Sequence, residues 1–250
     1  MAKNKVEFII GGPCAIETKE QFWNTVKDIH KYVNIFRAGV WKARTSPSDY
    51  PGFGDRALEW IRLAQKKYNT PFAVEVGTTR HVELAIQHDI KILWIGARTT
   101  SNPFAVQELA NALRGVDVEI WIKNPIFPNL KLWIGAFERF SRNKITHTKA
   151  IYRGFYAEKL KKYRNAPRWD LLREFQKSCP NTAVIFDPSH IAGQANLIRP
   201  LCAKARKENI HGLMIEVHSN PDKALSDSNQ QLNPRGFIKL LRDLDLTQSA

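Results

Sequence analysis

The chain has 250 residues, 43% of them hydrophobic, which is enough to bury the core of one α/β barrel domain of about 250 residues. With 38 Lys and Arg against 24 Asp and Glu, the net charge is +14, which favours anionic partners such as nucleic acid or a phosphorylated metabolite. No apolar run approaches the roughly 20 residues that a membrane helix needs, and the N-terminus lacks the apolar region of a signal peptide. The odd count of 3 cysteines indicates a reducing compartment, so we expect a cytoplasmic protein without a membrane span.

Short apolar runs with many β-branched residues recur along the chain and end in turn residues, which is typical of buried strands. In chain order, the predicted strands are 6–12, 34–40, 72–76, 92–96, 119–123, 149–153, 183–187 and 212–217.

Helical periodicity fills much of the sequence between these runs. The first such segment, 19–33, repeats Phe22, Val26, Ile29 and Val33 on one face. The predicted helices are 19–33, 54–67, 103–113, 167–177, 194–207 and 234–244, and Asn102-Pro103 is a typical helix start. Strands that alternate with helices predict a parallel sheet, and eight such pairs predict a single (β/α)8 TIM barrel over residues 1–250.

Two connections are longer than a barrel requires. Residues 42–54 are rich in Pro, Gly and Ser, and residues 155–167 are basic and aromatic. Both follow predicted strands, so we expect them to overhang the rim of the barrel where reactive groups gather, as flexible loops.

Four metal-ligating residue types lie at or just beyond predicted strand ends, although their spacing forms no recognised metal motif. They are Cys14, His190, Glu216 and Asp227. A barrel would bring them to one rim, where a thiolate, an imidazole and two carboxylates would suit a divalent Mn, Fe, Co or Zn ion. Taken singly, each residue also fits a structural role, such as a buried small Cys or a hydrogen-bonding His.

Six basic residues fall on or after predicted strands: Arg37, Lys42, Arg44, Arg98, Lys123 and Arg153. Nearby Glu17, Glu75 and Asp187 are too few to neutralise them all, so a multiply anionic ligand is the natural partner. The alternative is a set of solvated rim charges. Because the basic residues form neither a tail nor a recognised nucleic-acid motif, we expect no nucleic-acid partner.

Eight short sequence segments, in order, carry a family resemblance: GPCAIET, FRAGVWKARTSP, IGARTT, IKNP, YRG, DPSH-x-x-G, GLMIEVH and ALSD-x-x-Q. Over about residues 6 to 240, the chain resembles the 3-deoxy-D-arabino-heptulosonate 7-phosphate (DAHP) synthases of the shikimate pathway, especially the short bacterial form often fused to chorismate mutase. The family fold is a (β/α)8 barrel, as the strand and helix pattern independently predicts.

The resemblance implies a metal-dependent, aldol-type condensation of phosphoenolpyruvate with erythrose 4-phosphate, with release of phosphate. It implies a metal site made of Cys14, His190, Glu216 and Asp227. It further implies that phosphoenolpyruvate is bound by Arg98, Lys123 and Arg153 at its phosphate and is lined by Arg37 and Lys42, while Arg44 and Thr45 contact the aldose phosphate. Lys42, Cys14 and His190 are the expected catalytic residues, with Lys42 as a candidate for proton transfer.

Several alternatives stay open. A 3-deoxy-D-manno-octulosonate 8-phosphate synthase, which uses arabinose 5-phosphate, typically has one more residue between the matching Lys and Arg, whereas here only Ala43 separates Lys42 from Arg44. Where the family commonly reads K-P-R-T, this chain has Ala43, which we expect to add loop freedom only. A non-catalytic anion-binding barrel is the remaining alternative. We expect a homo-oligomer, and the sequence leaves open whether a chorismate mutase acts as a separate chain.

Overall fold

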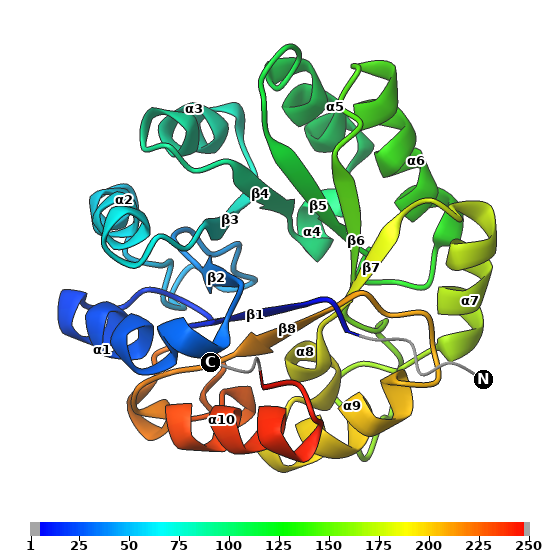
Figure 1. Cartoon of the computed structure of the whole chain (residues 1–250). Coiled ribbons are helices and arrows are strands. Elements are labelled where there is room, and N and C mark those ends of the chain that lie inside the picture. The colour runs from blue at the N-terminus through cyan, green and yellow to red at the C-terminus, as the bar shows by residue number, and fades with distance from the viewer. Residues whose placement is uncertain (1–5, 248–250) are drawn as a thin grey trace.

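The computed structural model describes residues 6–247, and its strands close into a barrel (Figure 1). The strands are β1 (Phe8–Gly12), β2 (Ile35–Ala38), β3 (Phe72–Val76), β4 (Ile92–Ile95), β5 (Glu119–Lys123), β6 (Thr148–Tyr152), β7 (Ala183–Phe186) and β8 (Gly212–Glu216). Each strand is parallel to the next, and β8 closes the ring by pairing Met214 with Ile10 of β1. All eight predicted strands and the predicted barrel are therefore confirmed.

Helices surround the ring. They are α1 (Lys19–Ile29), α2 (Ala57–Tyr68), α3 (Thr79–Gln87), α4 (Ala97–Thr100), α5 (Pro103–Ala112), α6 (Leu130–Arg142), α7 (Trp169–Ser178), α8 (Pro188–Ala192), α9 (Ile198–Ala205) and α10 (Pro234–Asp243). Short 3₁₀ turns cover His30–Tyr32, Ala195–Leu197, Pro221–Lys223 and Ser228–Gln230. Among the described residues, no helix is long and apolar enough to cross a membrane.

The six predicted helices are present, with ends that shift by up to a few residues. The segment predicted as one helix over 19–33 is α-helical only to Ile29 and continues as a 3₁₀ turn. Helices α3 and α6 were not among the six. In α6 the signal was available, because Asn129 accepts a hydrogen bond from the Leu132 amide and Trp133, Phe137 and Phe140 recur on the buried face.

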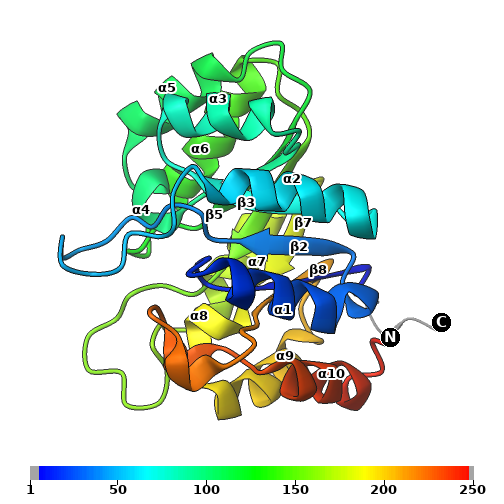
Figure 2. The same ribbon diagram turned by 90° about the vertical axis from the view of Figure 1, so that its left-hand side faces the viewer.

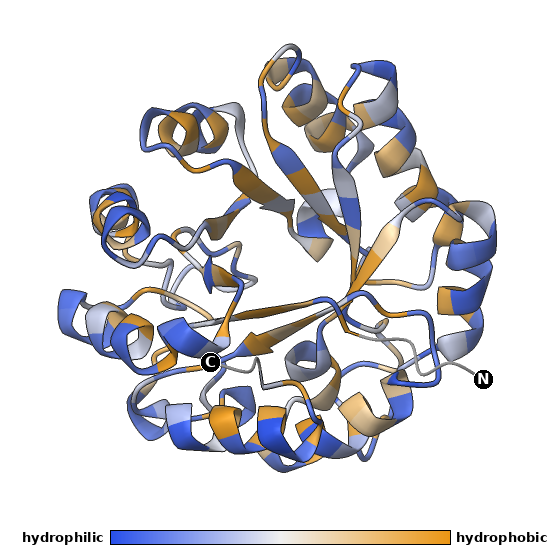
Figure 3. Cartoon of the chain, in the orientation of Figure 1, coloured by the Kyte–Doolittle hydropathy of each residue, from blue (hydrophilic) through white to orange (hydrophobic). Residues whose placement is uncertain are grey.

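The apolar core has two parts. The larger part lies between the outer faces of the strands and the helices, and the strands are accordingly coloured mostly as hydrophobic in Figure 3. The smaller part fills the barrel interior with inward-facing side chains: Ile10, Ala73, Ile92, Trp94, Trp121, Ile151, Ile185 and Met214. The barrel is thus a packed core and not a pore, as is usual for this fold.

The two long connections project from the same end of the barrel, as the side view shows (Figure 2). This is the end where the strands finish, and both connections contribute residues to the same pocket there. Their position at the rim therefore agrees with the prediction, while their mobility stays a prediction.

Candidate active site

Charged residues enter the barrel mouth because side chains alternate across each strand. Along five strands, the inward-facing position two residues beyond an apolar interior residue is charged. The pairs are Ala73 and Glu75, Trp121 and Lys123, Ile151 and Arg153, Ile185 and Asp187, and Met214 and Glu216. These charged residues therefore stand directly above the apolar layer, at the carboxyl ends of the strands.

A pocket of about 300 Å³ opens above this layer. Its walls come from several strand ends and from both long connections. The lining residues are Lys42, Ala43, Arg44, Glu75, Gly96, Ala97, Arg98, Lys123, Ile126, Arg153, Tyr156, Arg164, Asn165, His190 and Asp227. Most of the residues predicted from the sequence thus meet in one cavity.

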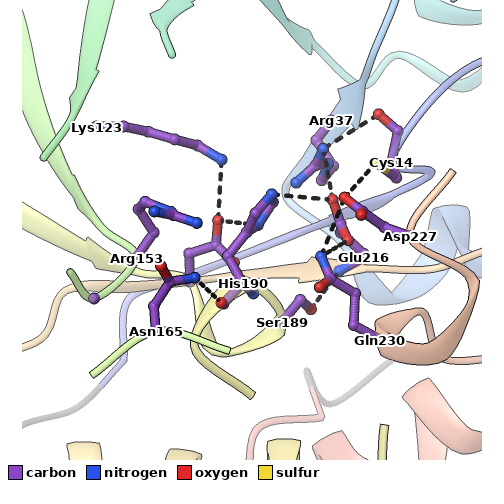
Figure 4. Close-up of polar contacts among 12 residues, drawn as sticks. Cys14, Arg37, Lys123, Arg153, Asn165, Ser189, His190, Glu216, Asp227 and Gln230 are labelled. Atoms are coloured by element: carbon purple, nitrogen blue, oxygen red, sulfur yellow. Dashed lines mark hydrogen bonds and ion pairs between the residues drawn. The ribbon is translucent and has the colours of Figure 1, made fainter. Parts of the chain in front are cut away.

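Three of the four predicted metal ligands form a compact cluster beside the pocket (Figure 4). Ligand atoms of Cys14, Glu216 and Asp227 lie within 4.8 Å of one another, and Cys14 Sγ is 3.3 Å from Asp227 Oδ2. His190 lies outside that cluster but next to it, because its Nε2 is 3.7 Å from Glu216 Oε1. The four residues therefore meet at one rim, with His190 at the edge of the group.

Asp187 orients His190. It caps α8 by accepting the His190 amide at Oδ1 (3.1 Å), while its Oδ2 lies 2.8 Å from His190 Nδ1. As a result, the other ring nitrogen of His190, Nε2, faces Glu216. Burial lowers the pKa of His190, which favours the neutral imidazole that binds metals. Burial raises the pKa of Asp187, but its contacts with His190 and Lys123 outweigh burial and hold the pKa of Asp187 well below its usual range.

The chemistry of this donor set fits a divalent cation. Burial, reinforced by the charge of Glu216, raises the pKa of the Cys14 thiol to about 12. A thiol in that environment becomes a thiolate only if a strong positive charge comes close. Sulfur, imidazole nitrogen and two carboxylates in one buried group are the ligand types that select first-row divalent metals.

Arg37 and Lys42 tie the basic side of the site to the cysteine-bearing turn. Arg37 pairs with Glu216 at 3.1 Å and donates to the carbonyl oxygen of Pro13 at 3.3 Å. Lys42 Nζ donates to the carbonyl oxygen of Cys14 at 3.2 Å. The turn can lie this close to β2 because Gly39 has no side chain: a Cβ there would stand 1.9 Å from the carbonyl oxygen of Cys14.

Some of the predicted cations have acidic partners, and others do not. Lys123 is paired with Asp187 at 3.1 Å. In the part of the chain that the structure describes, the guanidinium of Arg153 makes no hydrogen bond or ion pair, although the residue is only 8% exposed. Burial lowers its pKa to about 10, so it stays charged at neutral pH. A buried cation without a partner indicates a site for an anion.

The residues predicted for the second substrate lie at the mouth of the pocket. Arg98 Nη2 donates to Thr45 Oγ1 at 3.0 Å, which joins the end of β4 to the connection after β2. Arg44 donates through Nε to the carbonyl oxygen of Tyr50 at 2.7 Å, while its Nη2 is buried without a partner among the described atoms. Arg44 and Thr45 therefore lie close to Arg98.

Asp187, counted earlier with the cation partners, does pair with Lys123. Other residues of the site were not assigned a role from the sequence. Ser189 and Gln230 lie inside the quoted segments DPSH-x-x-G and ALSD-x-x-Q, so a signal was present for them. Ser189 accepts the backbone amide of Glu216 at 3.0 Å. Arg164 and Asn165 had no such signal, because their importance depends on where the second long connection folds. The acidic Glu17, counted earlier with the cation partners, instead contacts His218 at 3.3 Å.

The chain is similar to known enzymes over nearly its whole length. A family model described as the DAHP synthetase I family matches residues 2–248. A phospho-2-dehydro-3-deoxyheptonate aldolase of Thermotoga maritima is 29% identical over 94% of this chain and 68% of its own length. A 2-dehydro-3-deoxyphosphooctonate aldolase of Desulfotalea psychrophila is 28% identical over 88% of this chain and 81% of its own length.

Solved structures agree in fold. The crystal structure of the DAHP synthase from Thermotoga maritima superposes with a TM-score of 0.85 at 26% identity, covering 96% of this chain and 68% of that one. A truncated form of 3-deoxy-D-arabino-heptulosonate 7-phosphate synthase from the same organism gives a TM-score of 0.81 at 24% identity, covering 96% and 85%, and supports the barrel fold.

Proposed function

The chain belongs to the DAHP synthetase I family, and from this premise we propose how its pocket performs the reaction. That reaction is the condensation of phosphoenolpyruvate with erythrose 4-phosphate, with uptake of one water, to DAHP and inorganic phosphate. One observation supports the assignment of residues: three cations and a cluster of metal-ligating groups lie around one pocket. The cations are Arg98, Lys123 and Arg153, and the cluster is Cys14, Glu216 and Asp227.

Arg98, Lys123 and Arg153 would hold the phosphate of phosphoenolpyruvate. The exposed Arg98 guanidinium and the unpartnered Arg153 guanidinium offer planar pairs of donors, and Lys123 adds a point charge. Their positive charge would also stabilise the phosphate as it leaves.

Arg37 and Lys42 would line the rest of phosphoenolpyruvate. Arg37 Nη1 is buried and unpartnered among the described atoms, so it can bind a carboxylate oxygen. Burial disfavours the Lys42 ammonium, but Cys14 and Glu75 outweigh it and raise the pKa of Lys42, so the ammonium keeps its proton at neutral pH. The protonated Lys42 would lie near the new carbon–carbon bond, and it is the candidate for proton transfer there.

Cys14, His190, Glu216 and Asp227 would hold a divalent Mn, Fe, Co or Zn ion. When bound, such an ion supplies a Lewis acid for the aldehyde oxygen. The protein residues fix the position of both substrates, so that the methylene carbon of phosphoenolpyruvate faces the aldehyde carbon.

Arg44 and Thr45 would bind the phosphate of the aldose. Since Thr45 is already bonded to Arg98, the two substrate phosphates would lie on neighbouring donors at the mouth of the pocket. The matches to 2-dehydro-3-deoxyphosphooctonate aldolases are the observation behind the alternative substrate, arabinose 5-phosphate, which is less well supported. The family match and the short Lys42-Ala43-Arg44 spacing support erythrose 4-phosphate.

We further propose that residues 1–250 form one catalytic barrel domain and that the protein is a homo-oligomer in the cytoplasm. A chorismate mutase partner would be a separate chain. The 3 cysteines form no disulfide among the described residues, which agrees with a reducing compartment.

An aldose panel tests the proposal. Purified protein is incubated with phosphoenolpyruvate and either erythrose 4-phosphate or arabinose 5-phosphate, with and without a chelator, and the loss of phosphoenolpyruvate is followed. We expect rapid loss with erythrose 4-phosphate, none after chelation, and recovery when a divalent metal is restored. Full activity in metal-free protein would remove the metal from the proposal, and a preference for arabinose 5-phosphate would overturn the aldose assignment.

A further inference from the structure

The connection between β6 and α7 reaches across the rim and contacts two of the segments that carry proposed metal ligands. Arg164 Nη1 donates to Asp227 Oδ1 at 2.9 Å and to Gln230 Oε1 at 2.7 Å. The next residue, Asn165, donates through Nδ2 to the backbone carbonyl of His190 at 2.7 Å (Figure 4). Two adjacent residues thus hold the segments of two different ligands.

Gln230 extends this arrangement to a third ligand. Its side-chain amide is almost fully buried and donates to Glu216 Oε2 at 2.6 Å. Arg164 therefore occupies Oδ1 of Asp227 and Gln230 occupies Oε2 of Glu216, while Gln230 Nε2 also reaches Asp227 Oδ2 at the longer distance of 3.5 Å. The other Asp227 oxygen, Oδ2, lies 3.3 Å from Cys14 Sγ, and the other Glu216 oxygen, Oε1, faces His190 and Arg37.

The local sequence explains why Arg164 can take this position. The Arg164 amide donates to the carbonyl oxygen of Ile191 at 3.0 Å, and Phe155 and Ala166 exchange two backbone hydrogen bonds that close the loop. Gly193 has a positive φ of 68°, and a Cβ there would stand 2.6 Å from Cβ of Arg164. The glycine at the end of α8 is therefore what lets the loop lie against the metal side of the rim.

The backbone of Asp227 has a φ of 50°, in the left-handed region, which Asp adopts more readily than most residues with a side chain. It stands at the start of a short 3₁₀ turn and not on a strand, so the barrel alone does not orient its carboxylate.

We propose that Arg164 and Asn165 are positioning residues that hold Asp227 and His190 ready for the metal before it binds. This inference rests on the proposed metal site. Partners that bind the outer atoms of metal ligands restrict the orientation of those ligands, and their loss typically lowers metal affinity by about 10- to 100-fold.

A positive charge near a cation site also has a repulsive effect, which acts in the opposite direction. Removal of Arg164 would relieve that repulsion and free the carboxylate at the same time. If orientation dominates, Arg164→Ala binds metal more weakly. If charge dominates, Arg164→Ala binds metal more tightly, so the sign of the change decides between the two.

The test is a Co²⁺ titration of the metal-free protein, followed by the absorption band of a thiolate bound to cobalt and by calorimetry. We expect Arg164→Ala to weaken Co²⁺ binding by about 10- to 100-fold. Arg164→Lys should recover part of the loss, because an ammonium can still donate to Asp227. Asn165→Ala should show a smaller loss. Lys161→Ala, an exposed residue on the same connection, is the matched control and should bind as the wild type does.

Circular dichroism and thermal melting of each metal-free variant show whether it is folded before titration. Should Arg164→Ala not fold, Asn165→Ala decides the question. Wild-type affinity in Arg164→Ala, or in Asn165→Ala if Arg164→Ala does not fold, or tighter binding by Arg164→Ala, would overturn the positioning role while leaving the metal site intact. A wild-type protein that binds no Co²⁺ would overturn both the metal site and the inference.

Discussion

Lys123 Nζ lies 3.1 Å from Asp187 Oδ2, and both side chains are almost completely shielded from water. The same carboxylate oxygen lies 2.8 Å from His190 Nδ1. One buried Asp187 therefore connects a cation proposed for phosphoenolpyruvate with a histidine proposed for the metal. A change on either side leaves this carboxylate without one of its two partners.

Lys123→Met should consequently damage stability as well as substrate binding. Removing one partner of a buried ion pair typically costs about 3–5 kcal/mol because the other charge is left uncompensated. We expect a lower urea midpoint together with poor use of phosphoenolpyruvate. Unchanged stability would show that water or another cation compensates Asp187.

Arg98→Ala should affect substrate use alone, because Arg98 is exposed and contacts Thr45 but no acidic side chain in the described chain. Loss of a charge-assisted donor should cost about 1.5–3 kcal/mol, or roughly one to two decades in kcat/KM for phosphoenolpyruvate. Arg142→Ala, an exposed arginine on α6, is the control in the same kinetic assay. Equal kinetics in both variants would exclude Arg98 from the phosphate site.

Arg44→Ala should impair the dependence on erythrose 4-phosphate much more than the dependence on phosphoenolpyruvate. Arg44 has a buried, unpartnered Nη2, and its loss would remove a bidentate phosphate donor from only one substrate. Substrate titrations of the variant and the wild type measure the two effects separately. A defect confined to phosphoenolpyruvate would show that the connection after β2 binds the other substrate.

Cys14→Ser should weaken metal binding without unfolding the barrel, because the change removes a soft ligand and little volume from a fully buried position. Metal that binds the folded state raises the melting temperature by mass action. We expect Zn²⁺ or Co²⁺ to raise the melting temperature of the wild type and to have a much smaller effect on Cys14→Ser. Equal shifts would remove Cys14 from the ligand set.

His81 should make stability depend on pH. Its ring stacks on Trp41 at 4.1 Å, and its Nδ1 accepts the Gly77 amide at 3.2 Å. Burial lowers the pKa of His81 below its usual value of about 6.5. Since the unfolded chain then binds more protons in the window just below 6.5, this contribution to stability is present above that window and is lost as pH falls through it.

His81→Phe keeps an aromatic ring but cannot take up a proton. Urea unfolding at about pH 7.5 and at about pH 5 should therefore show a larger loss of stability in the wild type than in His81→Phe. The lowered pKa of His190 acts in both proteins and cancels in the comparison. The opposite order would mean that protonated His81 is favoured by the nearby Asp55.

Apolar periodicity was enough to predict the eight strands and the closed barrel, because each strand is both short and buried. It also placed charged residues at the strand ends, and Glu75, Lys123, Arg153, Asp187 and Glu216 each follow an inward apolar residue by two positions. In these strands, the alternation of side chains along the sequence is enough to tell which residues face the barrel interior.

The pattern fails where a residue's role depends on a distant partner. Sequence alone paired no acid with Arg37, whereas the structure pairs it with Glu216, which lies far away in the chain and close across the barrel. Arg164 looked like one of several basic loop residues until the fold brought it to Asp227. Loop conformations of this kind follow from contacts between segments and not from periodicity.

Arg37 pairs with Glu216, one of the proposed metal ligands, while its buried Nη1 has no partner among the described atoms. If Nη1 binds phosphoenolpyruvate as proposed, a single guanidinium contacts both the substrate and a metal ligand, and each would alter the free energy of binding of the other. By thermodynamic reciprocity, whatever factor the metal adds to the affinity for phosphoenolpyruvate, phosphoenolpyruvate must add to the affinity for the metal. The retention of the ion would therefore depend on the concentration of phosphoenolpyruvate.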